Sequence, residues 1–168
     1  MKKIFIFLLF LYGFVWSRGV YFRVGDTYEY ITNKLGAPEE IKDYGDSFQV
    51  LYRKTLGIDF LMDKNSGRCK EIRLNVGYPL KIEGCKIFDP IEKIFRIFGY
   101  PKSEYYCTKE QASKCFMGGD RVLYKLYNGS KKYVIQKEGI LFWFNNENEV
   151  IQIVVYKPYN KDIYLPLD

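Results

Sequence analysis

The chain carries two copies of one helical pattern, 63 residues apart, at residues 26–38 and 89–101. Each copy begins with Asp where a helix N-cap belongs and has Glu three residues later, as in a capping box. Each copy ends in Gly, which can adopt the left-handed conformation that terminates a helix, and has Pro two residues further on. The pattern therefore predicts two short helices, capped by Asp26 and Asp89, in two tandem repeats.

Alternation of apolar and polar residues follows each helical pattern, as is typical of β-strands. Residues 57–63 match residues 139–145, and a polar turn leads in each case to a returning strand, at 69–74 and 150–155. We therefore expect the α+β fold class. The expected architecture is two tandem repeats, at residues 18–79 and 80–157, each a capped helix (or helical hairpin) packed on one face of an antiparallel β-meander, with a C-terminal tail at 158–168.

The first 17 residues have the pattern of an export signal. Lys2 and Lys3 precede an apolar run over residues 4–16, and Val15 and Ser17 occupy the small-residue positions of a cleavage site. The run is shorter than the ~20 apolar residues that a membrane-spanning helix needs. We expect a signal peptide at 1–17, no integral membrane span after its removal, and a mature protein in the periplasm or outside the cell.

Export makes disulfides the expected state of the four cysteines, which allow three pairings. Cys107 and Cys115 bracket a short polar segment found in the second repeat alone, so they form the first expected pair. Cys69 and Cys85 would then be the second pair, while free or metal-binding thiols remain the alternative. Because the chain has no His and no C-x-x-C pattern, we expect no metal site.

Charge and composition exclude several classes of function. The formal net charge is +6, but basic and acidic residues are interspersed, which argues against a nucleic-acid partner. The absence of His removes the common nucleophile–base arrangements, and the carboxylate pairs Asp43 with Asp46 and Glu147 with Glu149 lie in polar stretches. We therefore expect no enzyme activity and no cofactor.

Residues 24–38, with the motif Val24-Gly25-Asp26 through Leu35-Gly36-Ala-Pro38, resemble a known repeat. The repeat is shared by the outer-membrane assembly lipoproteins of the SmpA/OmlA type and the secreted β-lactamase inhibitory protein. The second copy keeps Asp89, Ile94, Phe98-Gly99 and Pro101 of it. The resemblance implies helices on one sheet face and a protein partner on the other. It predicts an exported, non-enzymatic protein-binding module, inhibitor-like or envelope-assembly-like, although no Cys stands where those lipoproteins carry their lipid.

Alternation along the last strands selects candidate partner-binding residues. If Phe142 and Phe144 face the core, then Leu141 and Trp143 face the opposite side of the sheet. The same reasoning places Val154 and Tyr156 beside them, and Trp and Tyr are typical of protein interfaces.

Two alternatives to this binding patch remain open. The tail, through Ile163, Leu165 and Leu167, or the other repeat could cover that face as a second layer of core. The 16 Tyr and two Trp also suggest a secreted protein that binds carbohydrate or a cell-surface polymer.

Overall fold

The structure is a computed structural model that describes residues 18–111 and 119–167. The expected signal peptide and Cys115 lie outside these ranges. Along the described chain the elements follow in this order: β1 (Arg18–Phe22), α1 (Tyr28–Leu35), β2 (Glu40–Asp43), β3 (Ser47–Tyr52), α2 (Arg53–Leu56), β4 (Ile58–Asp63), β5 (Cys69–Asn75), α3 (Ile91–Phe98), β6 (Ser103–Cys107), β7 (Asp120–Leu126), β8 (Lys131–Ile135), β9 (Ile140–Phe144), β10 (Val150–Tyr156) and β11 (Ile163–Leu167).

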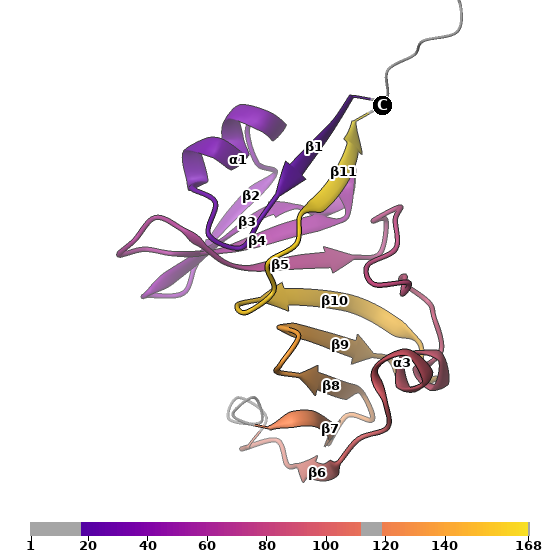
Figure 1. Ribbon diagram of the computed structural model, residues 1–168. Coiled ribbons are helices and arrows are strands. Elements are labelled where there is room, and N and C mark those ends of the chain that lie inside the picture. The colour runs from indigo at the N-terminus through magenta and orange to yellow at the C-terminus, as the bar shows by residue number, and fades with distance from the viewer. Residues whose placement is uncertain (1–17, 112–118, 168) are drawn as a thin grey trace, which may run out of the picture.

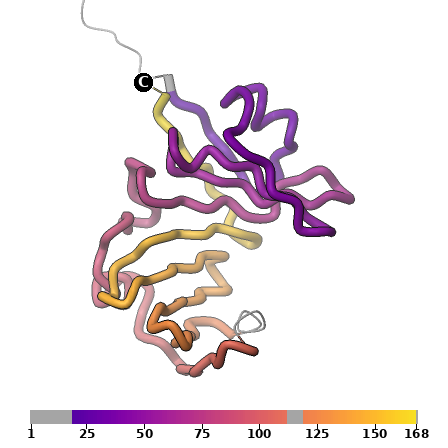
Figure 2. The backbone as a smooth tube through the Cα atoms, turned by 180° about the vertical axis from the view of Figure 1, so that it is seen from behind, coloured from indigo at the N-terminus to yellow at the C-terminus, as the bar shows by residue number. Residues whose placement is uncertain are grey.

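One nine-stranded sheet dominates the described chain (Figure 1), with strand order β2-β3-β4-β5-β10-β9-β8-β7-β6. Neighbouring strands are antiparallel except β6 and β7, which are parallel and make the sheet mixed. A separate two-stranded sheet joins β1 to β11, with Phe22 paired to Ile163. Figures 1 and 2 show this small sheet at the end of the molecule opposite β6. It ties the first described residues to the last ones.

The predicted fold class is wrong: the protein is mostly β, and its helices are short. Two separate helix-on-meander layers do not form, because β5 and β10 pair directly, with Leu74 opposite Ile153. This pairing fuses the strands into a single sheet. Helices of eight residues, α1 and α3, are too small to cover it. Residues expected to be a tail form β11 instead, and this strand needed a partner at the other end of the chain.

The helices α1 and α3 lie where the repeated pattern predicts helices, but Asp caps neither of them. Thr27 is the N-cap of α1 and accepts a hydrogen bond from the Tyr30 amide at 3.2 Å, while Asp26 accepts one from the Arg23 amide. Pro90 precedes α3 without a side-chain cap. Gly36 and Gly99 end the two helices as predicted, with φ of 80° and 91°, values that disfavour residues with a Cβ atom.

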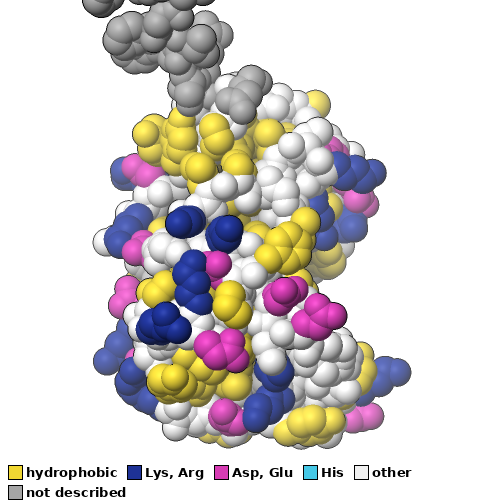
Figure 3. Space-filling model, turned by 90° about the vertical axis from the view of Figure 1, so that its right-hand side faces the viewer, with side chains coloured by type: hydrophobic (Ala, Val, Ile, Leu, Met, Phe, Trp, Pro, Cys, Tyr) yellow, Lys and Arg dark blue, Asp and Glu magenta, His cyan; other side chains and the backbone are white. Residues whose placement is uncertain are grey.

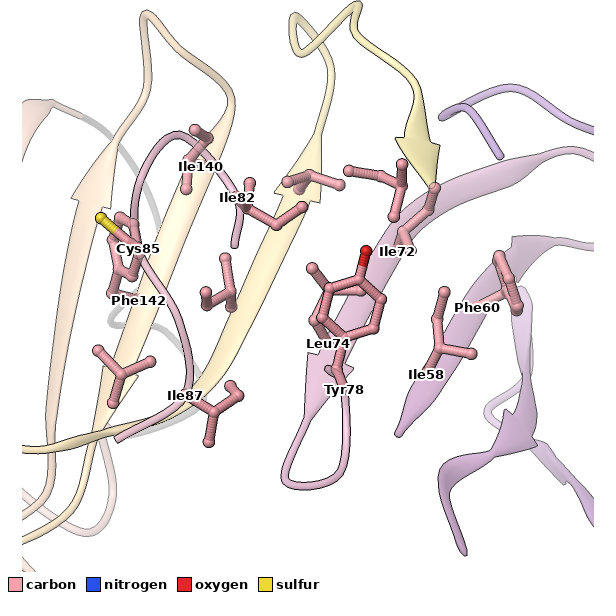
Figure 4. Packing of buried hydrophobic residues seen from close by; sticks show 14 of the residues in the cluster. Ile58, Phe60, Ile72, Leu74, Tyr78, Ile82, Cys85, Ile87, Ile140 and Phe142 are labelled. Carbon is pink, nitrogen blue, oxygen red and sulfur yellow. The ribbon is translucent and has the colours of Figure 1, made fainter. Parts of the chain in front are cut away.

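The main core lies on one face of the large sheet, beneath α1, α3, the loop 76–90 and the β1–β11 sheet. Figure 4 shows its centre, where Tyr78 lies over Leu74 and Cys85 lies beside Phe142. The Tyr78 hydroxyl donates to the Tyr164 carbonyl at 2.6 Å, which fastens the loop to β11. On the side of the molecule shown in Figure 3, basic and acidic side chains are interspersed. The core therefore takes up one sheet face and leaves the other to be examined for function.

Candidate functional site

The four candidate residues lie together on the sheet face away from the main core. Leu141 and Trp143 belong to β9, and Val154 and Tyr156 belong to the neighbouring β10. All four line one groove of about 380 Å³. We call it the Trp143 groove, and its remaining lining residues are Glu71, Arg73, Val134, Gln136 and Gln152.

The floor of the Trp143 groove is apolar. In the strand register Leu141 lies between Val134 of β8 and Val154 of β10. Val134 is 7% exposed and Val154 is 6% exposed, whereas Leu141, Trp143 and Tyr156 are half-buried. Strand β11 packs against the main core, on the opposite sheet face, so it does not cover the groove. The two valines therefore serve as a floor, and the larger side chains form the accessible surface.

An ion pair borders the groove on β5. Arg73 donates from Nε and Nη2 to the same Glu71 carboxylate oxygen, at 2.9 and 2.7 Å. Both side chains are about one-third exposed or less, so water screens this pair less than it screens a fully exposed one. Burial raises the pKa of the Tyr156 hydroxyl at the groove to about 12, with Glu71 adding to the effect. Tyr156 is therefore neutral near physiological pH.

Lys132 on β8 is the residue that sequence reasoning missed. Its side chain is nearly buried, at 3% exposed, and its Nζ lies 3.7 Å from the centre of the Trp143 ring. Burial lowers the pKa of Lys132 to about 7, and the charge of Arg73 adds to this effect while Glu71 opposes it. Alternation along β8 puts Lys132 on the same face as Val134. The signal was present, but residues 128–137 were interpreted as an insertion that only lengthens a hairpin.

A polar cluster lies beside the groove, centred on the fully buried Asp59 of β4. Its Oδ2 atom accepts hydrogen bonds from Gln49 and Asn75, both at 3.1 Å, and from the Arg53 guanidinium. Gln152 in turn donates to the Asn75 side-chain oxygen at 2.7 Å. The cluster therefore fixes the orientation of one wall of the Trp143 groove through hydrogen bonds between side chains.

A second, smaller apolar cluster adjoins the groove on β6, β7 and β8, and Leu141 and Trp143 pack against it. Its buried members are Cys107, Val122, Tyr124, Leu126 and Val134. Tyr105 stacks on Tyr124, with ring centres 5.8 Å apart. Trp143 is therefore held on one side by this cluster and by Lys132, and borders the groove on the other.

The predicted disulfide between Cys69 and Cys85 is absent, since both residues carry free thiols. Cys69 begins β5, whereas Cys85 lies in the loop 76–90, where Figure 4 shows it beside Phe142 of β9. The two thiols therefore pack against different parts of the core. Cys107 is buried at the end of β6. Its expected partner Cys115 lies outside the described residues, so that pairing stays a prediction.

Within residues 18–111 and 119–167, no group of three or more His, Cys, Asp or Glu residues is placed to hold a metal ion. The helices found in the same ranges are too short and too polar to cross a bilayer. The candidate carboxylate Asp43 accepts from the Lys64 ammonium at 2.7 Å, and Glu149 accepts from Asn145 at 3.2 Å. These carboxylates are thus held by neighbouring side chains within loops and strand ends.

Comparisons with known proteins give one likeness of fold. No protein-family model matches this chain, and no curated protein matches it in sequence. Its fold is similar to that of an extracellular protein containing a SCP domain from Bacillus anthracis str. Ames, with a TM-score of 0.51 and 12% sequence identity. The similarity covers 86% of this chain and 50% of that one, so this chain spans about half the length of that protein. At this identity the likeness concerns the fold alone.

Proposed function

We propose that this chain is an exported, non-enzymatic protein-binding module and that the Trp143 groove is its binding surface. The observation that carries the proposal is the convergence of Leu141, Trp143, Val154 and Tyr156 on one groove. Aromatic side chains in a partly desolvated setting supply large contact area at low entropic cost and dominate protein interfaces. The resemblance of residues 24–38 to secreted inhibitory and envelope-assembly repeats supports the same class of function.

Export rests on the signal-like pattern of residues 1–17, and the similar fold of an extracellular protein is consistent with it. A binding role fits the chemistry of the groove better than catalysis does. Glu71 and Arg73 neutralise each other at 2.7 Å, and the raised pKa of Tyr156 keeps its proton in place near neutral pH. These three groups therefore supply neither a free base nor a ready acid.

The test uses residues 18–168 as an immobilised bait against envelope and culture fractions of the host. A captured protein is identified, purified and titrated against the wild type, Trp143→Ala and Tyr106→Ala. Tyr106 is 67% exposed on β6, outside the groove, and is the matched control. We expect Trp143→Ala to weaken binding about thirtyfold, a loss of ~2 kcal/mol typical of an interface hot spot, and Tyr106→Ala to bind like the wild type.

Equal affinity of a folded Trp143→Ala variant for the captured protein would contradict the proposed surface. Retention of the bait on glycan resin, lost in Trp143→Ala, would instead support carbohydrate binding. That outcome is less expected, because Lys132 lies 3.7 Å from the Trp143 ring centre and takes up ring surface on which a sugar would stack.

A further inference from the structure

The charges around the Trp143 groove do not balance. Arg73 and Lys132 contribute two cations, while Glu71 contributes one anion and already accepts two hydrogen bonds from Arg73. The other titratable side chains near Lys132 are Tyr124 and Tyr156, whose raised pKa values keep them neutral near physiological pH. Among the described residues that face Lys132, the positive charge therefore exceeds the negative charge by one when Lys132 is protonated.

We propose that the Trp143 groove receives an acidic peptide segment of the partner, in which an apolar side chain lies against Trp143 and Leu141 and an adjacent carboxylate is bound by Arg73 beside Lys132. This inference rests on the proposed protein-binding role of the groove and gives the partner its chemistry.

Arg73 has the donors that a carboxylate requires. A guanidinium carries five N–H groups in a planar fork, and Glu71 accepts from two of its nitrogen atoms. The remaining donors suit a second carboxylate, since charge-assisted hydrogen bonds from Arg are among the stronger polar contacts. A basic segment would instead add a third cation to a surface that already holds two.

Lys132 gives the acidic segment a dependence on pH. Its depressed pKa of about 7 follows mainly from burial, and a carboxylate nearby favours the protonated amine. By linkage, a ligand that raises the pKa of Lys132 binds more tightly where Lys132 is charged. Affinity for an acidic segment should therefore fall as the pH rises through 7 toward 8.5.

The groove also suits the other parts of a peptide. Val134, Leu141 and Val154 form an apolar floor for one or two aliphatic side chains. Gln136 and Gln152 line the same groove, and their side-chain amides offer hydrogen bonds to peptide N–H and C=O groups. A volume of about 380 Å³ fits a short run of side chains and not a folded domain.

The experiment uses the single tryptophan of the mature chain. Of the two Trp residues, Trp16 lies in the expected signal peptide, so the emission of residues 18–168 comes from Trp143. The probe is the peptide acetyl-Ala-Leu-Glu-Leu-Ala-amide, and the matched control peptide has Gln in place of Glu. Titration at pH 6 in low salt should change the Trp143 emission with at least tenfold higher affinity for the acidic peptide.

Three variants then test the assigned roles. Arg73→Gln and Lys132→Met should each reduce the preference for the acidic peptide to about twofold or less. Glu71→Gln removes the competing carboxylate and should tighten the acidic peptide several-fold, a gain that misfolding cannot imitate. Raising the pH from 6 to 8.5 should weaken the acidic peptide and leave the Gln peptide unchanged.

Equal affinity for the two peptides, no emission change with either peptide at millimolar concentration, or a preference that survives Arg73→Gln would overturn the acidic-segment proposal. These outcomes are separate from failure of the proposed function. A captured partner that still depends on Trp143 while the two peptides bind equally would remove the acidic specificity and keep the binding surface.

Discussion

The Nζ atom of Lys132 lies 3.7 Å from the centre of the Trp143 indole ring, on the sheet face away from the main core. The two residues are paired across β8 and β9. A cation over an aromatic face is favourable, and the contact holds the indole against the sheet. Trp143 is thereby fixed before any partner arrives, which lowers the entropic cost of binding through this residue.

The buried amine of Lys132 predicts a stability that rises with pH. Its pKa in the folded protein is about 7, below the ordinary 10.5, so between these values the unfolded chain binds a proton that the folded one does not. The free energy of unfolding should therefore increase with pH across this window, by up to about 2 kcal/mol between pH 7 and pH 9. Urea denaturation at several pH values measures it.

Lys132→Met is the control for this pH dependence, since it keeps the aliphatic length and removes the titrating group. The difference in unfolding free energy between wild type and variant isolates Lys132 from other groups that titrate near pH 9. If this difference stays constant from pH 7 to pH 9, the pKa of Lys132 is not depressed in the folded protein.

Trp143→Ala should cost less stability than Phe142→Ala, although the two residues are adjacent on β9. Phe142 is fully buried in the main core, so its truncation should cost about 3–5 kcal/mol. Trp143 is half-buried and should cost about 1–2 kcal/mol through lost packing with Leu141 and Lys132. Circular dichroism during urea unfolding measures both variants. Equal losses would place Trp143 in the core and argue against its role in binding.

The candidate groove could be predicted from the sequence because side-chain alternation is a local rule. Once Phe142 is assigned to the core, the backbone puts Leu141 and Trp143 on the opposite face, whatever the rest of the chain does. Lys132 obeys the same rule, but its place beside Trp143 depends on the register between β8 and β9. That register joins residues across a hairpin whose turn the pattern did not define.

The overall fold could not be predicted in the same way, because it depends on pairings between distant segments. The antiparallel contact of β5 with β10 joins residues about 80 positions apart, and β1 pairs with β11 across nearly the whole described chain. No local pattern encodes these partners. The helix caps failed for a smaller reason: Thr27 follows Asp26 directly, and both are good capping residues, so the pattern alone chose the wrong one.

The two free thiols should resist alkylation in the native protein. Burial raises the pKa of Cys69 to about 12 and that of Cys85 to about 11, so neither forms an appreciable amount of reactive thiolate at pH 8. Iodoacetamide followed by mass spectrometry should modify both residues in denaturant and neither under native conditions. Rapid native labelling of one thiol would show that its segment opens on the timescale of the reaction.

Asp89 should matter for stability through two contacts outside the helix cap. It is 5% exposed, accepts from the Lys86 amide at 2.9 Å and pairs with the Lys93 ammonium at 2.6 Å. Asp89→Ala should cost about 1–2 kcal/mol, because it leaves the amide without its acceptor. Lys93→Ala should cost about 1 kcal/mol or less, since the amide bond remains and Lys93 is one-third exposed. Urea unfolding of both variants should preserve this order.

The contacts of Asp89 also give a dependence on acid. The Lys93 ammonium and the Lys86 amide outweigh the effect of burial and lower the pKa of Asp89 below its ordinary value of 3.8. The stabilisation is therefore present above pH 4 and is lost as the pH falls through the lowered pKa. The difference in unfolding free energy between wild type and Asp89→Ala should shrink below pH 4. A difference that does not change with acid would assign the effect of Asp89 to packing alone.

Cys107 and Cys115 are still expected to be bonded in the exported protein, since the sequence places them at the two ends of a short polar segment. Non-reducing peptide mapping of residues 18–168, purified from an oxidising compartment, should recover them as one cross-linked peptide pair. Closing so short a loop stabilises a fold by about 2–3 kcal/mol in the chain-entropy model, so reduction should lower the melting temperature and leave the sheet intact. Cys107→Ser is the control, and reducing agent should not change its melting temperature. Recovery of Cys107 in alkylated form from non-reduced protein would rule the pairing out.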